Sequence, residues 1–157
     1  MGGHERLADY LQTEGVEFTV RQHAEAYTAQ EVAHVDHIPG HLFLKVVMVL
    51  ADDELAMLCM PAPYDVDFDM AKAALGAREV RLANEAEFAP RFPDCDIGAM
   101  PPFGNLYDCP VYVDPALTED ERIVFNACNH EQSVEILYED WERLVQPTVA
   151  RIARQRS

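Results

Sequence analysis

The pattern of apolar and polar residues predicts a mixture of strands and helices. Residues 42–50 read Leu-Phe-Leu-Lys-Val-Val-Met-Val-Leu and form the most apolar stretch of the chain. This composition is typical of a strand with both faces buried. Asp52 and Asp53 then predict a turn, and a second apolar run covers 55–60. Residues 42–60 are therefore predicted to form a β-hairpin that ends at Pro61.

Capping residues predict helices on both sides of this hairpin. Apolar spacing over 7–11 predicts a helix that ends at Gly15, followed by a strand over 16–22. A capping box, Thr-Ala-Gln-Glu, predicts a second helix from Thr28 to about Ile38. After the hairpin, two more helices are predicted around a strand over 79–82: one over 67–75 that ends at Gly76, and one over 84–89 that begins with a second capping box, Asn84-Glu-Ala-Glu87.

The last third of the chain is mostly strand in character. Short strands are predicted over 111–113, 123–125 and 134–138, and Asp140 is predicted to cap a final helix that Pro147 interrupts. Because strands and helices do not alternate regularly, the order favours an α+β fold over a doubly wound α/β fold.

Length and composition predict one domain over residues 1–157. The chain has 157 residues, of which 49% are hydrophobic, and no long polar linker divides it. The longest apolar run is far shorter than the ~20 residues that cross a bilayer, so no membrane role is expected. The four cysteines include no Cys-x-x-Cys pair and the chain opens without an apolar signal segment, so a reduced, cytoplasmic setting is expected.

The charge of the chain limits its partners. There are 28 acidic and 12 basic residues, which gives a formal net charge of −16 and a pI near 4.5. Such a field repels nucleic acid at long range, so DNA is not expected as a partner and any RNA must be held locally. The scarcity of lysine and abundance of carboxylates also suggest a protein that works in high salt.

Lys45 is the most informative single residue, because it is a lone cation within the apolar strand and Lys72 is the only other lysine. Period two places Phe43, Lys45, Val47 and Val49 on one face. A buried ammonium is costly unless it faces a cleft, finds an anion or reaches water along its own stem. Two interpretations follow: a cationic anchor for a polar or anionic substrate, or an edge-strand lysine that discourages aggregation.

A second candidate feature is the loop Gly98-Ala-Met-Pro-Pro-Phe-Gly104. Its adjacent prolines, Pro101 and Pro102, exclude helix and ladder strand, so we expect a stiff loop with an exposed backbone. Such a backbone can bind a small polar ligand at little ordering cost, with Phe103 as a pocket wall. The alternative is an ordinary tight connection.

Polar residues at the end of the predicted strand 123–125 form a third feature. Asn126 and His130 follow this strand, and Ser133 lies nearby. His130 suits a base or a hydrogen-bond donor, although a histidine in a turn is also common as a solvated surface residue. The C-terminal arginines 143, 151, 154 and 156 fit either RNA phosphate contacts or the dipole of the last helix.

Other common chemistries have no matching motif. The chain has no His-Glu-x-x-His pattern, no closely spaced cysteine pair, no Gly-x-Ser-x-Gly elbow and no glycine-rich nucleotide loop. We therefore expect neither a metal nor another cofactor, and no covalent nucleophile stands out.

Several of these motifs, taken in order, resemble the YbaK/EbsC family, which shares its domain with the editing insertion of bacterial prolyl-tRNA synthetases. The matching pieces are His23…Tyr27-Thr28-Ala-Gln-Glu-Val-Ala33, Phe43-Leu-Lys45, Gly98-Ala-Met-Pro-Pro-Phe-Gly104, Val111-Tyr-Val-Asp114 and Ile123-Val-Phe-Asn126…His130. The resemblance implies an α+β domain with a mixed, largely antiparallel curved sheet or barrel-like core flanked by helices.

The resemblance also implies a free-standing hydrolase that cuts the ester of wrongly charged aminoacyl-tRNA without metal or covalent intermediate, helped by the substrate's ribose hydroxyl. By similarity, Lys45 engages the acceptor end or stabilises negative charge, and Gly98 opens the loop that positions the aminoacyl group and water. His130 joins them as a catalytic candidate. The expected substrate contacts are Tyr27, Thr28, Pro101, Phe103, Gly104, Asn126 and Ser133.

Two departures from the family leave specificity open. Some relatives carry a carboxylate where Ser133 stands, and many carry Ser-Pro where this chain reads Pro101-Pro102. The expected substrate is tRNA for proline carrying a small wrong amino acid. The alternative function is a non-catalytic module that binds an aminoacyl group or small ligand and docks on a tRNA synthetase.

Overall fold

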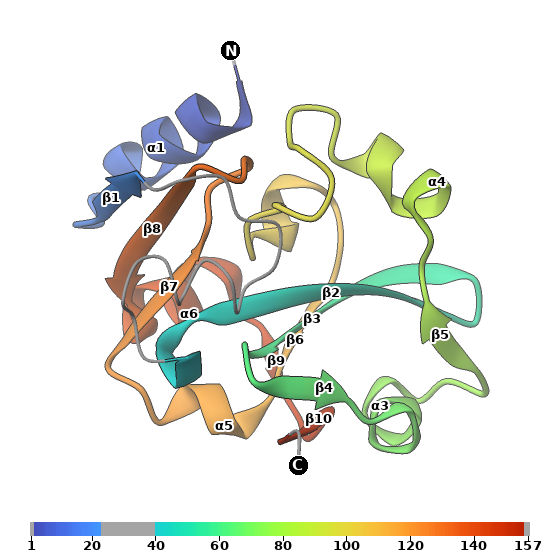
Figure 1. Cartoon of the computed structure of the whole chain (residues 1–157). Coiled ribbons are helices and arrows are strands. Elements are labelled where there is room, and N and C mark those ends of the chain that lie inside the picture. The colour runs from blue at the N-terminus through green and yellow to red at the C-terminus, as the bar shows by residue number, and fades with distance from the viewer. Residues whose placement is uncertain (1, 23–39, 156–157) are drawn as a thin grey trace.

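A computed structural model describes residues 2–22 and 40–155 (Figure 1). Its helices are α1 (Gly3–Thr13), α3 (Phe68–Leu75), α4 (Glu85–Phe88), α5 (Pro115–Thr118) and α6 (Tyr138–Val145), with short 3-10 turns at Gly40–Leu42, Ala89–Arg91 and Gly104–Leu106. Its strands are β1 (Thr19–Gln22), β2 (Leu44–Ala51), β3 (Glu54–Pro61), β4 (Tyr64–Val66), β5 (Val80–Leu82), β6 (Val111–Val113), β7 (Arg122–Asn126), β8 (Gln132–Leu137), β9 (Thr148–Val149) and β10 (Ala153–Gln155).

The predicted hairpin forms the centre of the fold. β2 and β3 pair antiparallel over their whole lengths, with Lys45 opposite Met60. Asp52 and Asp53 make the turn with φ values of 48° and 71°, which suits the two-residue hairpin turns that need positive φ. The Asp52 carboxylate also accepts hydrogen bonds from the backbone N–H groups of Arg78 and Glu79, so the turn holds the chain that leads into β5.

The hairpin belongs to a mixed sheet with the order β5-β2-β3-β6-β9. Its β2–β3 and β2–β5 pairs are antiparallel, whereas β3–β6 and β6–β9 are parallel. Two smaller antiparallel sheets have the orders β1-β8-β7 and β10-β4. The predicted α+β class with a largely antiparallel sheet is confirmed, but the strands in the described ranges do not close a barrel.

One residue pair links two of these sheets. Phe43, just before β2, makes a parallel bridge with Val124 on β7. In Figure 1, β2 accordingly starts beside β7 and crosses the molecule toward β5. The start of β2 therefore lies next to the middle of β7, two residues before Asn126.

Two hydrophobic clusters cover the opposite faces of the five-stranded sheet. Leu44 and Met48 point into the larger cluster, which includes residues of α1 and α6 and Phe103 of the 98–104 loop. Val49 points into the smaller cluster, with residues of α3 and β10. Because Lys45 has the parity of Val49, its side chain leaves β2 on the face of the smaller cluster.

Most local signals in the sequence mark element ends correctly. Gly15 follows α1 with φ +71°, and the N–H groups of Gly15 and Val16 bond to Gln12 and Leu11, which is a Schellman motif. Asp67 caps α3 by accepting from the Met70 N–H. α4 begins with the predicted capping box.

Other boundaries differ from the prediction. β1 starts at Thr19 and not at residue 16, because residues 16–18 run out of the α1 cap before they reach β8. α6 starts at Tyr138 with Leu137 at its N-cap, so the prediction that Asp140 caps this helix is wrong. Asp140 lies inside the first turn, where a carboxylate still suits the helix dipole.

The predicted helix from Thr28 lies outside the described residues. Among the helices of residues 2–22 and 40–155, none is long and apolar enough to cross a membrane.

Candidate active site

The end of β7 brings two of the predicted polar residues together. Asn126, the last residue of β7, pairs with Ser133 on β8, so their side chains share one face of this sheet. Both residues are buried: Asn126 is 9% exposed, and Ser133 is fully buried. Among the described residues, the Oδ1 atom of Asn126 has no hydrogen-bond donor. The hydrogen-bonding capacity of this buried amide oxygen is therefore unused among the described residues.

The Gly98 loop docks on the turn that follows β7. The Cys128 N–H donates to the Ala99 carbonyl at 2.9 Å, and the Asp96 N–H donates to the Cys128 carbonyl at 2.8 Å. His130 Nε2 lies 2.8 Å from the Ile97 carbonyl oxygen. Because a carbonyl can only accept, Nε2 must carry the proton. His130 thus donates to the residue before Gly98 and holds the loop against the turn that follows β7.

Gly98 itself adopts a conformation that favours glycine. Its φ is +86°, and a Cβ added there would lie 3.6 Å from Cε1 of His130. That contact is ordinary, so the backbone dihedral and not crowding accounts for the glycine. Gly98 and His130 are therefore neighbours, as the shared site requires.

Lys45 approaches the same region from β2. Phe43 is bridged to Val124. Lys45 follows Phe43 by two residues on β2, and Asn126 follows Val124 by two residues on β7. With a side-chain period of two, both residues leave the bridge on the face of the sheet that carries Phe43 and Val124. By this parity Lys45, Asn126 and Ser133 point to the same side of their strands, and β2 belongs to a different sheet from β7 and β8.

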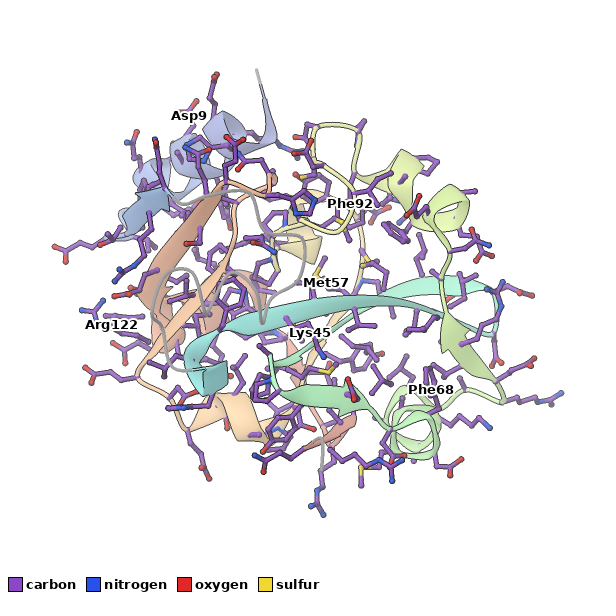
Figure 2. The ribbon with its side chains drawn as sticks, viewed as in Figure 1. Asp9, Lys45, Met57, Phe68, Phe92 and Arg122 are labelled. Carbon is purple, nitrogen blue, oxygen red and sulfur yellow. The ribbon has the colours of Figure 1, made fainter. Side chains whose placement is uncertain are left out.

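The Lys45 ammonium has an anionic partner. Nζ contacts the backbone carbonyl of Tyr64 and lies 3.4 Å from the Asp65 carboxylate, both on β4. Figure 2 shows the side chain between β2 and β4. The side chain is 20% exposed, against 52% for Asp65. β5 pairs with β2 over Val49–Ala51, so at Lys45 the described sheet partner of β2 is β3, through Met60.

The rest of the 98–104 loop is buried, which corrects the expectation of an exposed backbone. Phe103 is fully buried and packs edge-on against Phe125 and Tyr10, so it belongs to the core and not to a pocket wall. Pro101 is buried. A Cβ on Gly104 would lie 2.2 Å from the Cys109 carbonyl oxygen, so this glycine serves close backbone packing.

Several residues that support the loop had no signal in the sequence pattern. Trp141 of α6 donates from Nε1 to the Pro102 carbonyl at 2.8 Å. On the other side of the loop, Asp94 accepts from the Tyr107 hydroxyl at 2.9 Å and pairs with Arg6 of α1 at 3.3 Å. Burial acts to raise the pKa of Asp94, but the hydrogen bonds from Tyr107 and Arg6 together lower it.

The cysteines are poorly suited to act as nucleophiles. Burial raises the pKa of Cys59 and raises that of Cys109 to about 11. The pKa of Cys95 is also raised, first by its hydrogen bond with Cys128 and then by burial. Since the thiolate is the reactive form, these groups are mostly inactive near neutral pH.

Two predicted substrate contacts, Tyr27 and Thr28, lie outside the described residues. Within the described ranges, no group of three or more His, Cys, Asp or Glu side chains is arranged to hold a metal ion. The described contacts pair a buried acceptor, Asn126, with a buried hydroxyl, Ser133, place Gly98 beside His130, and hold the Lys45 cation against β4. Such a set suits a ligand that carries a donor close to developing negative charge.

Comparison with known proteins now defines the class. A sequence model of the aminoacyl-tRNA editing domain matches residues 23–144, which is most of the chain. The chain therefore belongs to the aminoacyl-tRNA editing domain family, as the motif resemblance predicted. No functionally curated protein matches it.

Solved structures confirm the fold. A candidate trans-editing enzyme for prolyl-tRNA synthetase is similar with a TM-score of 0.85 and 18% identity, covering 98% of each chain. The crystal structure of the hypothetical protein APE2540 is similar with a TM-score of 0.85 and 16% identity, covering 94% of this chain and 99% of the other. At these identities the likeness shows a shared fold.

Proposed function

We propose that this protein is a trans-acting aminoacyl-tRNA deacylase. Its substrate is tRNA for proline that carries a small wrong amino acid, and its reaction is hydrolysis of the ester between that amino acid and the terminal ribose. Family membership supports the class of reaction. The arrangement at the end of β7 supports the assignment of residues.

The observation that carries this proposal is the buried amide oxygen of Asn126. A buried acceptor without a donor costs about 1–3 kcal/mol, which a ligand donor offsets. The α-ammonium of an aminoacyl ester has N–H donors next to the carbonyl that is attacked. We assign Asn126 to this ammonium, and we assign Ser133 on the paired strand to the wall beside it.

The reaction also needs a group that stabilises negative charge. Water adds to the ester carbonyl, and the oxygen becomes an oxyanion. The C–O bond to the ribose then breaks, and the ribose oxygen takes up the proton that the attacking water loses, with help from the neighbouring hydroxyl, so that the amino acid leaves with a free carboxyl group. A fixed cation or N–H donor at the oxyanion lowers the barrier by ~3 kcal/mol. Lys45 and the Gly98 loop are assigned this role, and His130 positions the loop.

The proposed setting is the cytoplasm, where charged tRNA is used, and the proposed RNA contact is the acceptor end. With a formal net charge of −16, the surface disfavours the phosphates of a whole tRNA. A tRNA synthetase that presents the acceptor end would reduce this repulsion, so it is the proposed protein partner.

A panel of mischarged tRNAs tests the function. Tritium-labelled alanine, cysteine and serine are each charged onto tRNA for proline and onto their own tRNAs, and release is followed with and without the protein. We expect faster release from tRNA for proline carrying a small wrong residue. Release at the spontaneous rate in every case would contradict the proposal. Tight binding of the same tRNAs without release would instead indicate the non-catalytic module.

A further inference from the structure

The contact between Lys45 and Asp65 joins the candidate site to an element that the family motifs do not include. Asp65 lies in the middle of β4, and its carboxylate is 3.4 Å from the Lys45 Nζ. The backbone carbonyl of the preceding residue, Tyr64, also accepts a hydrogen bond from the Lys45 ammonium. Two acceptors on one short strand thus define where the end of this long side chain lies.

β4 is itself held in place from both ends. The Ala62 N–H donates to the Phe43 carbonyl at 2.8 Å, which ties the approach to β4 to the start of β2. Beyond β4, the Asp67 N–H donates to the Ile152 carbonyl at 2.9 Å. The backbone that carries the Asp65 carboxylate is therefore held in place on both sides.

The partner strand of β4 is fixed by a buried carboxylate. β10 pairs antiparallel with β4 and places Arg154 opposite Asp65. Asp114, only 5% exposed, accepts the N–H groups of Ile152 and Ala153 at 3.0 Å each. The C-terminal strand thus fastens β4 to β6, and through it Asp65 to the central sheet.

We propose that Asp65 is a positioning residue that fixes the place and the charged state of the Lys45 ammonium. A free lysine side chain has many rotamers, and ordering it at the moment of reaction costs rate. A carboxylate on a fixed strand orders it beforehand. The consequence for catalysis rests on the proposed deacylase function, but the pairing itself does not.

The two lysines of the chain make the pairing measurable without any substrate. In protein labelled with 13C at the lysine ε carbon, only Lys45 and Lys72 contribute signals. Replacing Asp65 by Asn keeps the shape and removes the charge. We expect the Lys45 signal to shift and its titration midpoint to fall by about half a pH unit, while the Lys72 signal stays unchanged. An unchanged Lys45 signal and midpoint would overturn the proposal.

A neighbouring carboxylate provides the matched control. Asp69 is exposed in the first turn of α3 and has no described contact with Lys45. Asp69→Asn removes the same charge from the same side of the molecule. It should leave the Lys45 midpoint within about 0.1 pH unit of wild type, because an exposed charge at a distance is screened. An equal shift in both variants would show a general field effect and would overturn the specific role.

Steady-state kinetics then measure how much the positioning of Lys45 by Asp65 contributes to turnover. We expect Asp65→Asn to lower kcat about threefold to tenfold with little change in KM, and Asp65→Glu to recover part of the loss. A rise in kcat would show that the carboxylate competes with the oxyanion for the lysine, and would overturn a positioning role. If wild-type protein releases no amino acid from any substrate, the proposed function fails while the resonance measurement still decides the pairing.

Discussion

At the scale of single residues, each polar group near the end of β7 contributes something different. Asn126 offers a buried acceptor, Lys45 offers a charge, and His130 uses its Nε2 proton to hold the loop. None of these groups lies alone on an exposed surface. Asn126 and His130 are buried and the Lys45 side chain is 20% exposed, which strengthens their interactions with a ligand, because electrostatic contacts weaken with exposure to water.

Gly98→Ala is expected to reduce both stability and activity. A Cβ at φ +86° is strained by roughly 1–2 kcal/mol, and relief of that strain would move the loop away from His130. Gly15→Ala is the matched control, since Gly15 also has positive φ and nothing lies within 4 Å of an added Cβ. Denaturant unfolding should show similar losses in both variants. Deacylation should fall only in Gly98→Ala, and equal activity in the two would argue against the loop's role.

The sequence was informative about individual residues only where local chemistry is unusual. Lys45 stands out because a cation interrupts an apolar strand, and Gly98 because glycines bracket a proline pair. Asp65 carries no such mark. Its role depends on the pairing of β4 with β10, which joins residues far apart in the chain. Phe103 was misjudged for a related reason, since only the fold shows that its ring packs against Tyr10 and Phe125.

At the scale of elements, the Gly98 loop is positioned by anchors on both sides. Trp141 of α6 binds the Pro102 carbonyl, and Asp94 binds Tyr107 and Arg6. Arg6 also lies over the Tyr107 ring at 4.8 Å from its centroid. The loop is therefore ordered by contacts with α1, α6 and the β7–β8 turn.

Asp94→Asn tests this anchor through pH. The lowered pKa of Asp94 means that its ionised form stabilises the fold. That stabilisation is present above the unfolded value near 3.8 and is lost as pH falls through the lower folded value. We expect Asp94→Asn to melt below wild type at pH 7, with the gap closing as the pH falls below about 4. A gap of constant size would contradict this account, and Asp9→Asn, an exposed change on α1, should show no gap.

Local element signals were reliable because they depend on neighbouring residues. The Asp52-Asp53 turn, the Gly15 and Gly76 ends and the capping box at Asn84 all formed where the sequence placed them. The parallel pairing of β6 with β3 and β9 had no such signal. Parallel partners are set by how the whole chain packs, and strands of two or three residues are too short to show a period.

At the scale of the whole molecule, charge is the dominant property. A net charge of −16 over 157 residues repels itself and also repels RNA. At about 1 M salt the screening length falls to about 3 Å, against about 10 Å at 0.1 M. Added salt should therefore weaken both the repulsion within the protein and its repulsion of RNA.

Salt should therefore raise both stability and substrate affinity. We expect the melting temperature to increase and KM for mischarged tRNA to decrease as KCl rises from about 0.05 M to about 1 M, because repulsion is screened over this range. This is the reverse of the usual salt dependence of RNA binding. Melting curves and initial rates over a KCl series provide the check, and a shared optimum in dilute buffer would contradict the expectation.

The most direct measurement is the first-order rate of alanine release from alanine-charged tRNA for proline, with wild type and Lys45→Ala compared under single-turnover conditions. Lys72→Ala, which removes the only other lysine, is the control. We expect at least about a 100-fold loss for Lys45→Ala, which corresponds to one oxyanion-stabilising group, and no loss for Lys72→Ala. A folded Lys45→Ala protein that releases alanine at the wild-type rate would contradict the proposed site.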